Sequence, residues 1–462
     1  MDLFKAIYNL FWGDLFTIPL PGGSSLGISL LVLILVPAGI FFTIRTKFLP
    51  FRCFPEMIKI SVEKQTGKDK SALSGIQALI VSTATRVGMG NMVGVVAAIS
   101  AGGAGAVFWM WVMALLGSST AFIEATLAQL HKEKDPLYGG YRGGPAYYIH
   151  NFFAKHRKKS IIAVLFALSG LLCWCGVSQV ISNSVSSAFY NAFNIPPIIS
   201  TIILVALAAV IVLRKNATVK VLDVIVPVMA IFYFVITLII IFRNIGQIPA
   251  VFTRIFEEAF GVRQVVAGGF GAALMQGVKR GLFSNEAGSG SAPCAAAAAD
   301  VSHPAKSGLF QAFGVFIDTI VICSCTAMIM LMAPSELLEG LSGMALLQTA
   351  MSYHFGQPGV VFIAITLWLF SFSTFIGILF YARSNVAYVF GDNWKSQTIY
   401  KILALVMLFI GGLAQYTFVW DLGDIGIALM TIFNMIAIIP MSGQAIRSLD
   451  DYYKKRKENI KS

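Results

Sequence analysis

Two apolar stretches of this sequence carry glycines and polar residues in patterns that favour the binding of ions and small ligands. The first is TRVGMGNMVGV (residues 85–95), and the second is GVKRGLFSNEAGSGSAP (residues 277–293). Glycine is a poor residue for a helix interior, so both stretches predict broken helices. A break frees backbone N–H groups that can hold a carboxylate, and carbonyl groups that can coordinate a small cation.

The first break is expected around Gly88, Met89 and Gly90. The N–H groups there would begin an outer half-helix and could hold a substrate carboxylate, while the carbonyls near Ala84 and Val87 would face a cation. Close helix packing is the alternative, because the first stretch also contains a GxxxG pattern. The sequence contains no HExxH, GxSxG or Walker pattern and no nucleophile with a base at membrane depth. An enzyme is therefore not expected, and no cofactor is predicted.

The composition predicts a helical membrane protein with many spans. Of the 462 residues 57% are hydrophobic and 12% are charged, whereas a soluble domain carries about 25% charged residues. Apolar blocks of membrane-spanning length recur along the chain, as at 26–44 and 221–242. No cleaved signal peptide is expected, because the first long apolar block begins only at residue 26.

The net charge of +12 has a distribution typical of membrane topology. Lys and Arg concentrate in the connections 45–70 and 132–159 and in the tail 447–462, whereas the connections 191–197 and 334–358 carry none. This positive-inside bias argues against a nucleic-acid partner. It predicts an N-terminus outside the cell, an odd number of spans and a cytoplasmic C-terminus; the basic connection 243–263 is an exception.

Eleven transmembrane helices are predicted, and the two broken spans occupy corresponding positions among them. The predicted spans are 26–47, 75–100, 104–130, 161–190, 198–213, 219–243, 264–299, 307–333, 358–390, 398–418 and 422–446. The second and seventh spans, which contain the breaks, are five spans apart, so two five-helix halves would have opposite orientations. Paired broken helices in inverted repeats indicate a midplane binding site in a secondary transporter.

Three regions follow from this pattern. Residues 1–70 would hold an amphipathic start, one extra transmembrane helix and a basic cytoplasmic loop. Residues 71–446 would form a ten-helix core with inverted repeats at about 71–243 and 264–446. Residues 447–462 would form a basic cytoplasmic tail.

The chain resembles the alanine or glycine:cation symporters from about residue 70 to 445. The motifs that carry this resemblance are VGMGNMVGVVAAISAGGAGAVFWMWVMALLGSSTAFIEATLAQ (87–129), GGPAYYI (143–149), RGLFSNEAGSGSAP (280–293) and GVFIDTIVICSCTA (314–327). The resemblance implies a LeuT-like five-plus-five fold preceded by one helix. It also implies symport of a small neutral amino acid, driven by sodium or sometimes protons, in a bacterial or archaeal cell membrane.

The resemblance also implies roles for individual residues. The backbone N–H groups of Met89 and Gly90 would meet the substrate carboxylate. Asn91 would lie nearby as a ligand of either the cation or the substrate, and Phe283, Ser284 and Asn285 would surround the amino group and side chain of the substrate. A sodium site would combine the carbonyls of Ala84, Val87 and Phe370 with the hydroxyls of Ser373 and Thr374. Alternatively, the two hydroxyls could simply bond to their own helix.

Three departures from the family pattern bear on the substrate. Met89 stands where the family usually has a small hydroxyl residue, Ile181 replaces a glutamine, and Ile378 replaces an aromatic residue. Gln179, Ser178 or Ser182 could compensate for the lost glutamine. An acid of the family also becomes Arg383. A less polar pocket is expected, with a volume changed in either direction. The alternative function is a proton-coupled carrier or exchanger, using Asp318 or Glu286, for a larger apolar amino acid.

Charged residues within the spans are expected to face the bundle interior and to pair. Arg280 and Glu286 could bridge the second break. Arg86 could stand in for a second cation, which would leave one sodium per cycle, or could extend to cytoplasmic water. Asp318 could be a coupling carboxylate or a structural one, and Glu124 is expected to contact the basic loop that follows it. The sequence does not predict the oligomeric state.

Overall fold

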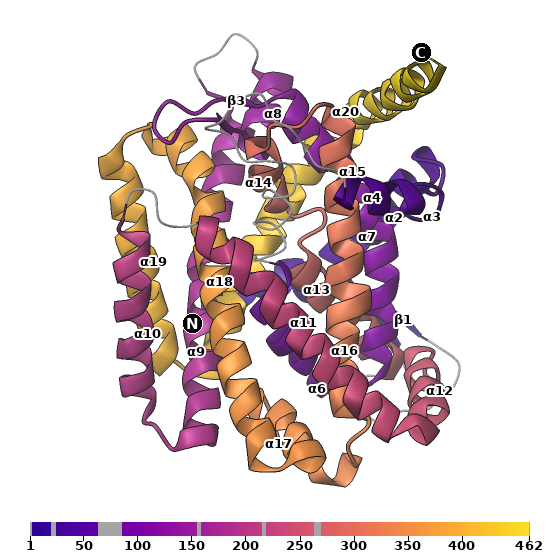
Figure 1. The fold of residues 1–462 in the computed structure, drawn as a ribbon, viewed down its shortest axis with the longest axis vertical. Helices are drawn as coiled ribbons and strands as arrows, with labels where there is room; N and C mark the ends of the chain where they lie inside the picture. The colour runs from indigo at the N-terminus through magenta and orange to yellow at the C-terminus, as the bar shows by residue number, and fades with distance from the viewer. Residues whose placement is uncertain are drawn as a thin grey trace.

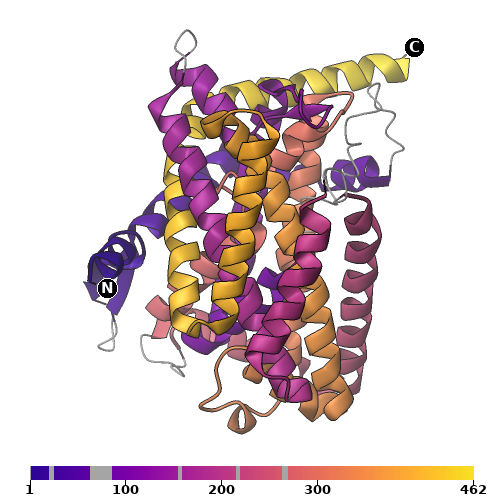
Figure 2. The same ribbon diagram turned by 90° about the vertical axis from the view of Figure 1, so that its left-hand side faces the viewer.

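The computed structural model describes residues 2–19, 25–62, 86–154, 159–214, 219–262 and 269–461, and they are almost entirely helical. The long helices run roughly along the vertical axis of Figure 1 and form one bundle. The same bundle is seen from its side in Figure 2, with the C-terminal helix lying across its upper end. The expected all-α class is confirmed.

The N-terminal region packs as an addition to the bundle. The short helix α1 is followed by an antiparallel hairpin in which Ile18 lies opposite Leu26. Helix α2 begins after Ser29, whose hydroxyl accepts a hydrogen bond from the Val32 N–H at 3.3 Å and caps the helix. The elements here are α1 (Asp2–Trp12), β1 (Asp14–Pro19), β2 (Ser25–Ser29), α2 (Leu30–Arg45), α3 (Leu49–Arg52) and α4 (Phe54–Val62).

The remaining elements follow the predicted spans closely. Up to the middle of the chain they are η1 (Gly90–Gly94), α6 (Val95–Gly102), α7 (Gly105–Leu130), β3 (Glu133–Lys134), β4 (Tyr141–Arg142), α8 (Pro145–Phe153), α9 (Ile161–Phe193), α10 (Pro197–Val212), α11 (Val219–Arg243), η2 (Ile245–Gln247) and α12 (Ile248–Ala259). They continue with α13 (Gly269–Asn285), α14 (Ala292–Ala298), α15 (Pro304–Val315), η3 (Phe316–Cys323), α16 (Ser324–Leu331), η4 (Ser335–Leu337), α17 (Met344–Phe355), α18 (Gln357–Phe390), α19 (Trp394–Leu413) and α20 (Tyr416–Lys461).

Each predicted span contains helix, but the number of membrane crossings remains a prediction. Within the described residues, six helices are long and apolar enough to cross a membrane, or seven if the bent pair Pro227–Arg243 and Ile245–Ala259 forms one span. The inner part of the second predicted span lies outside the described residues. The predicted tail is helical as far as Lys461, because α20 continues without interruption for 46 residues.

Large apolar side chains on the outer helices indicate a lipid-facing surface. Ile202 on α10, Ile231 on α11 and Ile402 on α19 are 50–62% exposed, and they are part of a larger set on these three helices. In water such a surface would be costly, whereas the hydrocarbon of a bilayer accommodates it. This distribution fits the protein's place among integral membrane proteins.

The basic segments gather at one end of the bundle. Among the described residues, α3 and α4 after α2, β3, β4 and α8 between α7 and α9, and the end of α20 lie at the upper end of Figure 1. Connections without Lys or Arg, 191–197 and 334–358, lie at the opposite end. With the exception of the basic connection 243–263, whose helix α12 lies at the lower end, the positive-inside pattern of the sequence corresponds to the two ends of the bundle.

The scaffold around the site depends on close helix approach. A Cβ atom added to Gly176 of α9 would lie 2.4 Å from the backbone nitrogen of Gly423 on α20. A side chain at this position would force the two helices apart, because neither backbone can give way by that amount. Small residues at this crossing therefore bring α20 against α9, beside the cavity described below.

Candidate functional site

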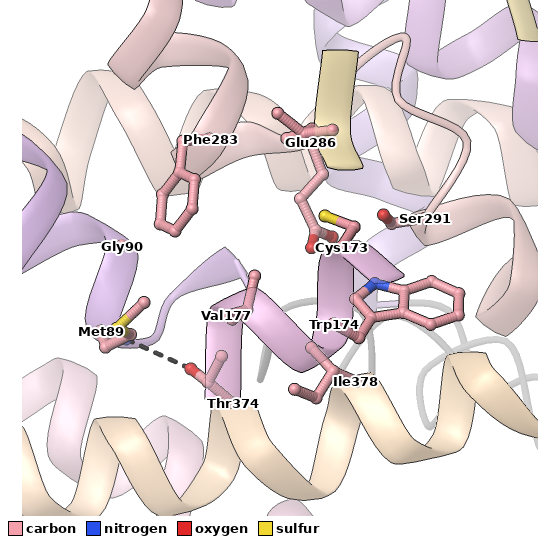
Figure 3. Close-up of a pocket in the computed structure, with 11 residues that line it drawn as sticks. Met89, Gly90, Cys173, Trp174, Val177, Phe283, Glu286, Ser291, Thr374 and Ile378 are labelled. Carbon is pink, nitrogen blue, oxygen red and sulfur yellow. Dashed lines mark hydrogen bonds between the residues drawn. The ribbon is translucent and has the colours of Figure 1, made fainter. Parts of the chain in front are cut away.

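A small cavity lies between the two helix breaks that the sequence predicted (Figure 3). Its free space is about 20 Å³, which is room for about one water molecule. The wall consists of Met89, Gly90, Cys173, Trp174, Val177, Phe283, Glu286, Ser291, Thr374, Ile378 and Ile427. Five elements contribute: the first break, α9, the region around the second break, α18 and α20. An amino acid would enter only if some of these side chains moved.

The first break contributes Met89 and Gly90 to the cavity wall. The Gly88 N–H donates to the Asn91 side-chain oxygen at 2.9 Å. The Met89 N–H donates to the Thr374 hydroxyl at 3.2 Å, the bond drawn in Figure 3. A Cβ on Gly90 would lie 3.3 Å from the Ser284 Cα. The glycine therefore lets the two breaks approach each other, and Met89 and Gly90 line the cavity.

The second break is a turn, residues 286–291, between α13 and α14. Glu286, Gly288 and Gly290 have φ values of 57°, 94° and 84°, in the left-handed region that glycine adopts easily. The Asn285 side-chain oxygen accepts from the Ala287 N–H at 3.0 Å. Asn285 therefore shapes the turn and does not reach the cavity, whereas Phe283, two residues earlier, lines it.

Side chains of distant helices hold this turn in place. The Gly288 N–H donates to Glu124 at 3.2 Å. The Asn434 amide donates to the other Glu124 oxygen at 2.9 Å and to the Gly288 carbonyl at 2.9 Å. The Tyr148 hydroxyl donates to the Asn434 oxygen. The predicted contact of Glu124 with the basic loop is wrong, because the buried carboxylate instead satisfies backbone groups freed by the break.

Asn434→Ala is expected to lower the free energy of unfolding by about 3 kcal/mol, because it leaves the Glu124 carboxylate and the Gly288 carbonyl without their buried donor. The measurement is the thermal unfolding temperature of the purified protein in detergent. Ser442→Ala on the same helix is the control, since within the described residues its hydroxyl bonds only to the Ile439 carbonyl of its own helix. Equal unfolding temperatures for the two variants would contradict this role of Asn434.

The end of α14 is capped by one side chain from the last turn of α7 and one from just beyond it. Gln129 donates to the Ala299 carbonyl at 2.9 Å, and the Lys132 ammonium donates to the same oxygen at 2.6 Å. Burial lowers the pKa of Lys132 to about 8, while nearby Asp300 opposes this shift. A cationic side chain on the last carbonyls of a helix satisfies groups that lack an internal partner.

Asp318 is the centre of a buried polar cluster next to the breaks. We define the Asp318 cluster as Asp318, Asn91, Ser284, Thr319 and Cys323. The Asn91 amide donates to one Asp318 oxygen at 2.7 Å, and the hydroxyls of Ser284 and Thr319 donate to the other at 3.0 and 2.6 Å. The structure therefore directs Asn91 and Ser284 towards Asp318, and neither belongs to the cavity wall.

The candidate sodium ligands of α18 lie against the first break. Ser373 and Thr374 donate to the Phe370 carbonyl at 2.9 and 2.8 Å, as the back-bonding alternative predicts. Thr374 does more than this, because its oxygen also accepts the Met89 N–H. Val87 is buried directly before the break, and Ala84 lies outside the described residues.

The predicted bridge between Arg280 and Glu286 is wrong. Arg280 instead pairs with both oxygens of Asp424 on α20, each at 3.2 Å. Lys279 approaches the same carboxylate to 2.7 Å, and the Arg280 guanidinium lies 3.9 Å from the Trp420 ring centre. A carboxylate 144 residues away in sequence thus receives both cations. The Glu286 side chain is directed into the cavity, where it accepts from the Tyr381 hydroxyl at 3.3 Å.

Arg86 is fully buried and donates to the Gln311 carbonyl at 3.1 Å. The alternative in which Arg86 extends to cytoplasmic water is therefore wrong. Arg383 lies away from the cavity, where it pairs with Asp135 at 2.8 Å. This ion pair gives the Arg383 side chain a partner outside the cavity.

The polar residues proposed on α9 do not reach the cavity. The Gln179 amide contacts the Met407 sulfur at 3.3 Å on α19. The hydroxyls of Ser178 and Ser182 bond to carbonyls of their own helix, and Ile181 is buried outside the cavity wall. The cavity instead receives Cys173, Trp174 and Val177, which sequence analysis did not identify. The spacing of Cys173 and Val177 places them on one helix face, but it does not reveal which way that face points.

Comparison with known proteins adds three findings. A family model described as the sodium:alanine symporter family matches residues 23–462. The probable sodium/glutamine symporter GlnT of Bacillus subtilis is 43% identical over 429 residues, covering 93% of this chain and 88% of that protein. The sodium/alanine symporter AgcS of Methanococcus maripaludis is 34% identical over 439 residues, covering 94% and 96%.

Solved structures show the same fold at low sequence identity. The crystal structure of MhsT in complex with L-phenylalanine superimposes with a TM-score of 0.55 at 13% identity, covering 81% of this chain and 89% of that one. At this identity the likeness shows the fold alone, and that fold is the LeuT-like transporter fold that the motifs implied.

Proposed function

Because this chain belongs to the sodium:alanine symporter family, we propose that it couples the inward movement of sodium to the uptake of a small neutral amino acid. The observation that carries the proposal is the cavity enclosed by both helix breaks and by α9, α18 and α20. Broken helices at membrane depth expose backbone groups where a ligand can satisfy them. In this fold such a site can open to each side of the membrane in turn.

The first break would bind the substrate carboxylate. It leads into η1 and α6, so its N–H groups form the positive end of a helical segment. The Met89 N–H donates to Thr374 in this structure, and substrate binding would redirect it or recruit the neighbouring Gly90 N–H. The cavity of about 20 Å³ would have to widen by movement of its side chains to admit even a small amino acid.

Sodium would bind between the first break and α18. The ligands would be the carbonyls of Ala84, Val87 and Phe370 and the hydroxyls of Ser373 and Thr374, all neutral oxygens suited to a monovalent cation that must also leave. The two hydroxyl hydrogens now point to the Phe370 carbonyl, so sodium binding would turn them away. A cation here would hold the first break against α18, so sodium and substrate should raise each other's affinity reciprocally.

The membrane arrangement is part of the proposal. We place the N-terminus outside and the C-terminus in the cytoplasm of a bacterial or archaeal cell, with eleven spans and two inverted five-helix repeats. The gathering of basic segments at one end of the bundle supports this orientation. The helices found in each predicted span, and the breaks in the second and seventh, support the repeat.

A proton-coupled carrier or exchanger for a larger apolar amino acid is the second candidate. Two carboxylates favour it: Glu286, which is half-buried and lines the cavity, and Asp318, which is fully buried beside the breaks. The relatives also differ in the substrate that their names state, glutamine in one and alanine in the other. Family membership therefore leaves substrate and coupling ion to experiment.

The deciding experiment is uptake by the purified protein in liposomes, with each neutral amino acid tested under an inward sodium gradient and with potassium replacing sodium. We expect accumulation of alanine or glycine only with sodium. Equal uptake with potassium in place of sodium would contradict the proposed sodium site. It would then indicate Asp318 and Glu286 as the groups that couple uptake to protons. Absence of uptake for every neutral amino acid would contradict the proposed function itself.

Met89→Thr is expected to change the ratio of glutamine to alanine uptake at least about tenfold in favour of glutamine, since one methylene in a pocket wall alters discrimination by about 10–200-fold. The Met89 side chain lines the cavity, and threonine is both smaller and more polar. Competition uptake in liposomes measures the ratio. Met92→Thr is the matched control, because Met92 lies buried in the same segment and outside the cavity wall. The same change of ratio in both variants would contradict the assignment.

A further inference from the structure

A second and larger cavity lies at the side of the bundle, between the short helices α3 and α4 and the helices α7, α15 and η3. Its free space is about 300 Å³, within the range of about 300–1,000 Å³ that is usual for ligand pockets. Figure 1 shows α3 and α4 lying across the upper part of the bundle, beside α7 and α15. We call it the lateral cavity, and its wall includes Phe51, Phe54, Ala114, Ser118, Phe316 and Ile320.

The wall of the lateral cavity is almost wholly apolar. Among the described residues that line it, Ser118 alone has a polar side chain. Its hydroxyl already donates to the carbonyls of Ala114 and Ala312, at 3.0 and 3.2 Å. Apolar cavities stay dry, and a polar ligand would find no side chain here to replace its hydrogen bonds with water. The occupant that matches this wall is therefore a hydrocarbon chain.

The lateral cavity opens towards the lipid-facing surface. Phe51 in its wall is 63% exposed, and Leu115 and Ile320, which belong to membrane-spanning segments, are half-buried. Phe48, directly before α3, is 57% exposed. Exposed aromatic side chains next to basic ones are typical of the headgroup region of a membrane. The acyl chains of phospholipids are thus the hydrocarbon chains that meet this opening.

The short helices that line the lateral cavity also carry exposed positive charge. Arg52 follows Phe51 in α3, and Lys59 lies in the last turn of α4. Both side chains are exposed, and neither takes part in an ion pair among the described residues. Glu56, the acid of α4, is paired with Arg456 of α20. This segment therefore complements an anionic headgroup rather than a neutral one.

The far wall of the lateral cavity belongs to η3. Phe316 and Ile320 line it from this element, and Phe54 of α4 packs on Phe316 at 4.9 Å between ring centres. Asp318, which lies between these two wall residues in sequence, accepts from the Asn91 amide at 2.7 Å. π-helical segments are rare and occur mostly at functional sites. A chain in the lateral cavity would thus support the element that holds the first break.

We propose that the lateral cavity binds an anionic phospholipid, with one acyl chain between α4, α7 and η3 and the phosphate group at Arg52 and Lys59. The bound chain fills the free space against an apolar wall, and the phosphate neutralises the exposed charges. Both effects favour the folded protein, so the lipid stabilises it. A second copy of the chain matches this surface less well, because a symmetric interface would bring the same basic side chains of two copies together.

The test is the thermal unfolding temperature of the purified full-length protein in detergent, titrated with dioleoyl phosphatidylglycerol or with dioleoyl phosphatidylcholine. We expect phosphatidylglycerol to stabilise the protein at a lower concentration than phosphatidylcholine. Glycerol 3-phosphate, which has the anionic group without the chains, should have no effect. These three probes separate the contribution of the chain from that of the charge.

The double variant Arg52→Gln, Lys59→Gln tests the phosphate contact. The phosphatidylglycerol concentration for half-maximal stabilisation should rise at least about tenfold, towards that of phosphatidylcholine, because two basic partners of an anionic group are lost. Lys159→Gln, Lys395→Gln is the matched control, since it removes two exposed charges from outside the segment that lines the lateral cavity. This control should keep the wild-type preference for phosphatidylglycerol.

Ala114→Leu tests the chain, because the added carbons occupy part of the lateral cavity. The half-maximal concentration of both lipids should rise at least about tenfold, since the acyl chain loses the burial of several methylene groups. Ala206→Leu on the lipid-facing side of α10 is the matched control. The double variant Arg52→Gln, Lys59→Gln changes exposed side chains only, so the proposal stays testable even where Ala114→Leu does not fold.

Four results would overturn the proposal. Equal stabilisation of the wild-type protein by the two lipids would remove the phosphate contact. An unchanged response to phosphatidylglycerol in both the charge variant and the cavity variant would place the lipid elsewhere. Loss of the preference in the Lys159→Gln, Lys395→Gln control would show a general effect of surface charge. If neither lipid acted and Ala114→Leu converted a dimer to a monomer in light scattering, the lateral cavity would hold a second copy of the chain.

Discussion

Uptake of alanine by Thr374→Val is expected to fall about a hundredfold at the same sodium gradient, if losing a sodium ligand and a buried hydrogen bond costs about 3 kcal/mol in total. Valine keeps the shape of threonine and removes only the hydroxyl. That hydroxyl donates to the Phe370 carbonyl and accepts the Met89 N–H. The hydroxyl therefore connects the candidate sodium site to the break that lines the cavity. The variant should bind sodium more weakly, and sodium should raise its substrate affinity less.

The measurement is initial uptake in liposomes as a function of external sodium, at fixed alanine. The sodium concentration for half-maximal uptake should rise with the loss of rate. Ser371→Ala, on the same helix, is the control, because its buried hydroxyl has no hydrogen-bond partner within the described chain. If Thr374→Val kept the wild-type sodium dependence, the Thr374 hydroxyl would have no part in sodium coupling.

Asp424→Asn is expected to destabilise the protein by roughly 3–5 kcal/mol, the usual cost of leaving buried charges without their partner. The carboxylate is 1% exposed and neutralises Lys279 and Arg280 on α13 together. Its helix also presents Trp420, which packs on Phe283 of the cavity wall at 4.8 Å between ring centres. The N-terminal helix α1 packs beside Asp424, since the Trp12 indole donates to the Asp424 backbone carbonyl at 3.0 Å.

Thermal unfolding in detergent and the yield of monodisperse protein measure this effect. Asp421→Asn is the control, because Asp421 is partly exposed on the same helix and forms no ion pair in the described part of the chain. The double variant Lys279→Met, Asp424→Asn should regain part of the stability, since one of the two unpaired cations is gone. Equal stability of Asp424→Asn and Asp421→Asn would contradict the central role of this ion cluster.

Much of the fold could be predicted because a membrane helix can be identified from its own sequence, without knowledge of its neighbours. A backbone in hydrocarbon must satisfy its own hydrogen bonds, so long apolar blocks become helices regardless of what surrounds them. Helices such as α9 and α18 therefore begin within a residue of the predicted spans. The breaks were equally visible, because glycine is costly inside a helix and a cluster of glycines in such a block indicates an interruption. The π-helical segments η1 and η3 gave no comparable signal.

The direction of side chains was predicted less well. Gln179 and Ser182 were expected at the cavity but face α19 or their own helix. Asn91 and Ser284 were expected around the substrate but donate to Asp318. A helix can carry the correct residues at the correct depth and still be rotated by a fraction of a turn, which moves a polar group from a cavity to a neighbouring helix.

The sequence by itself determined the membrane class, the helical segments, the family and the two breaks, because hydrophobicity and backbone satisfaction act over a few residues. Only the tertiary structure decided which charges meet. Asp424 receives Arg280 from 144 residues away, and Asn434 reaches Glu124 across 310 residues. A buried charge pairs with whatever partner the packed helices bring within reach. Because Arg280 pairs with Asp424, it does not bridge to Glu286 as the sequence had suggested, and the Glu286 side chain lines the cavity instead.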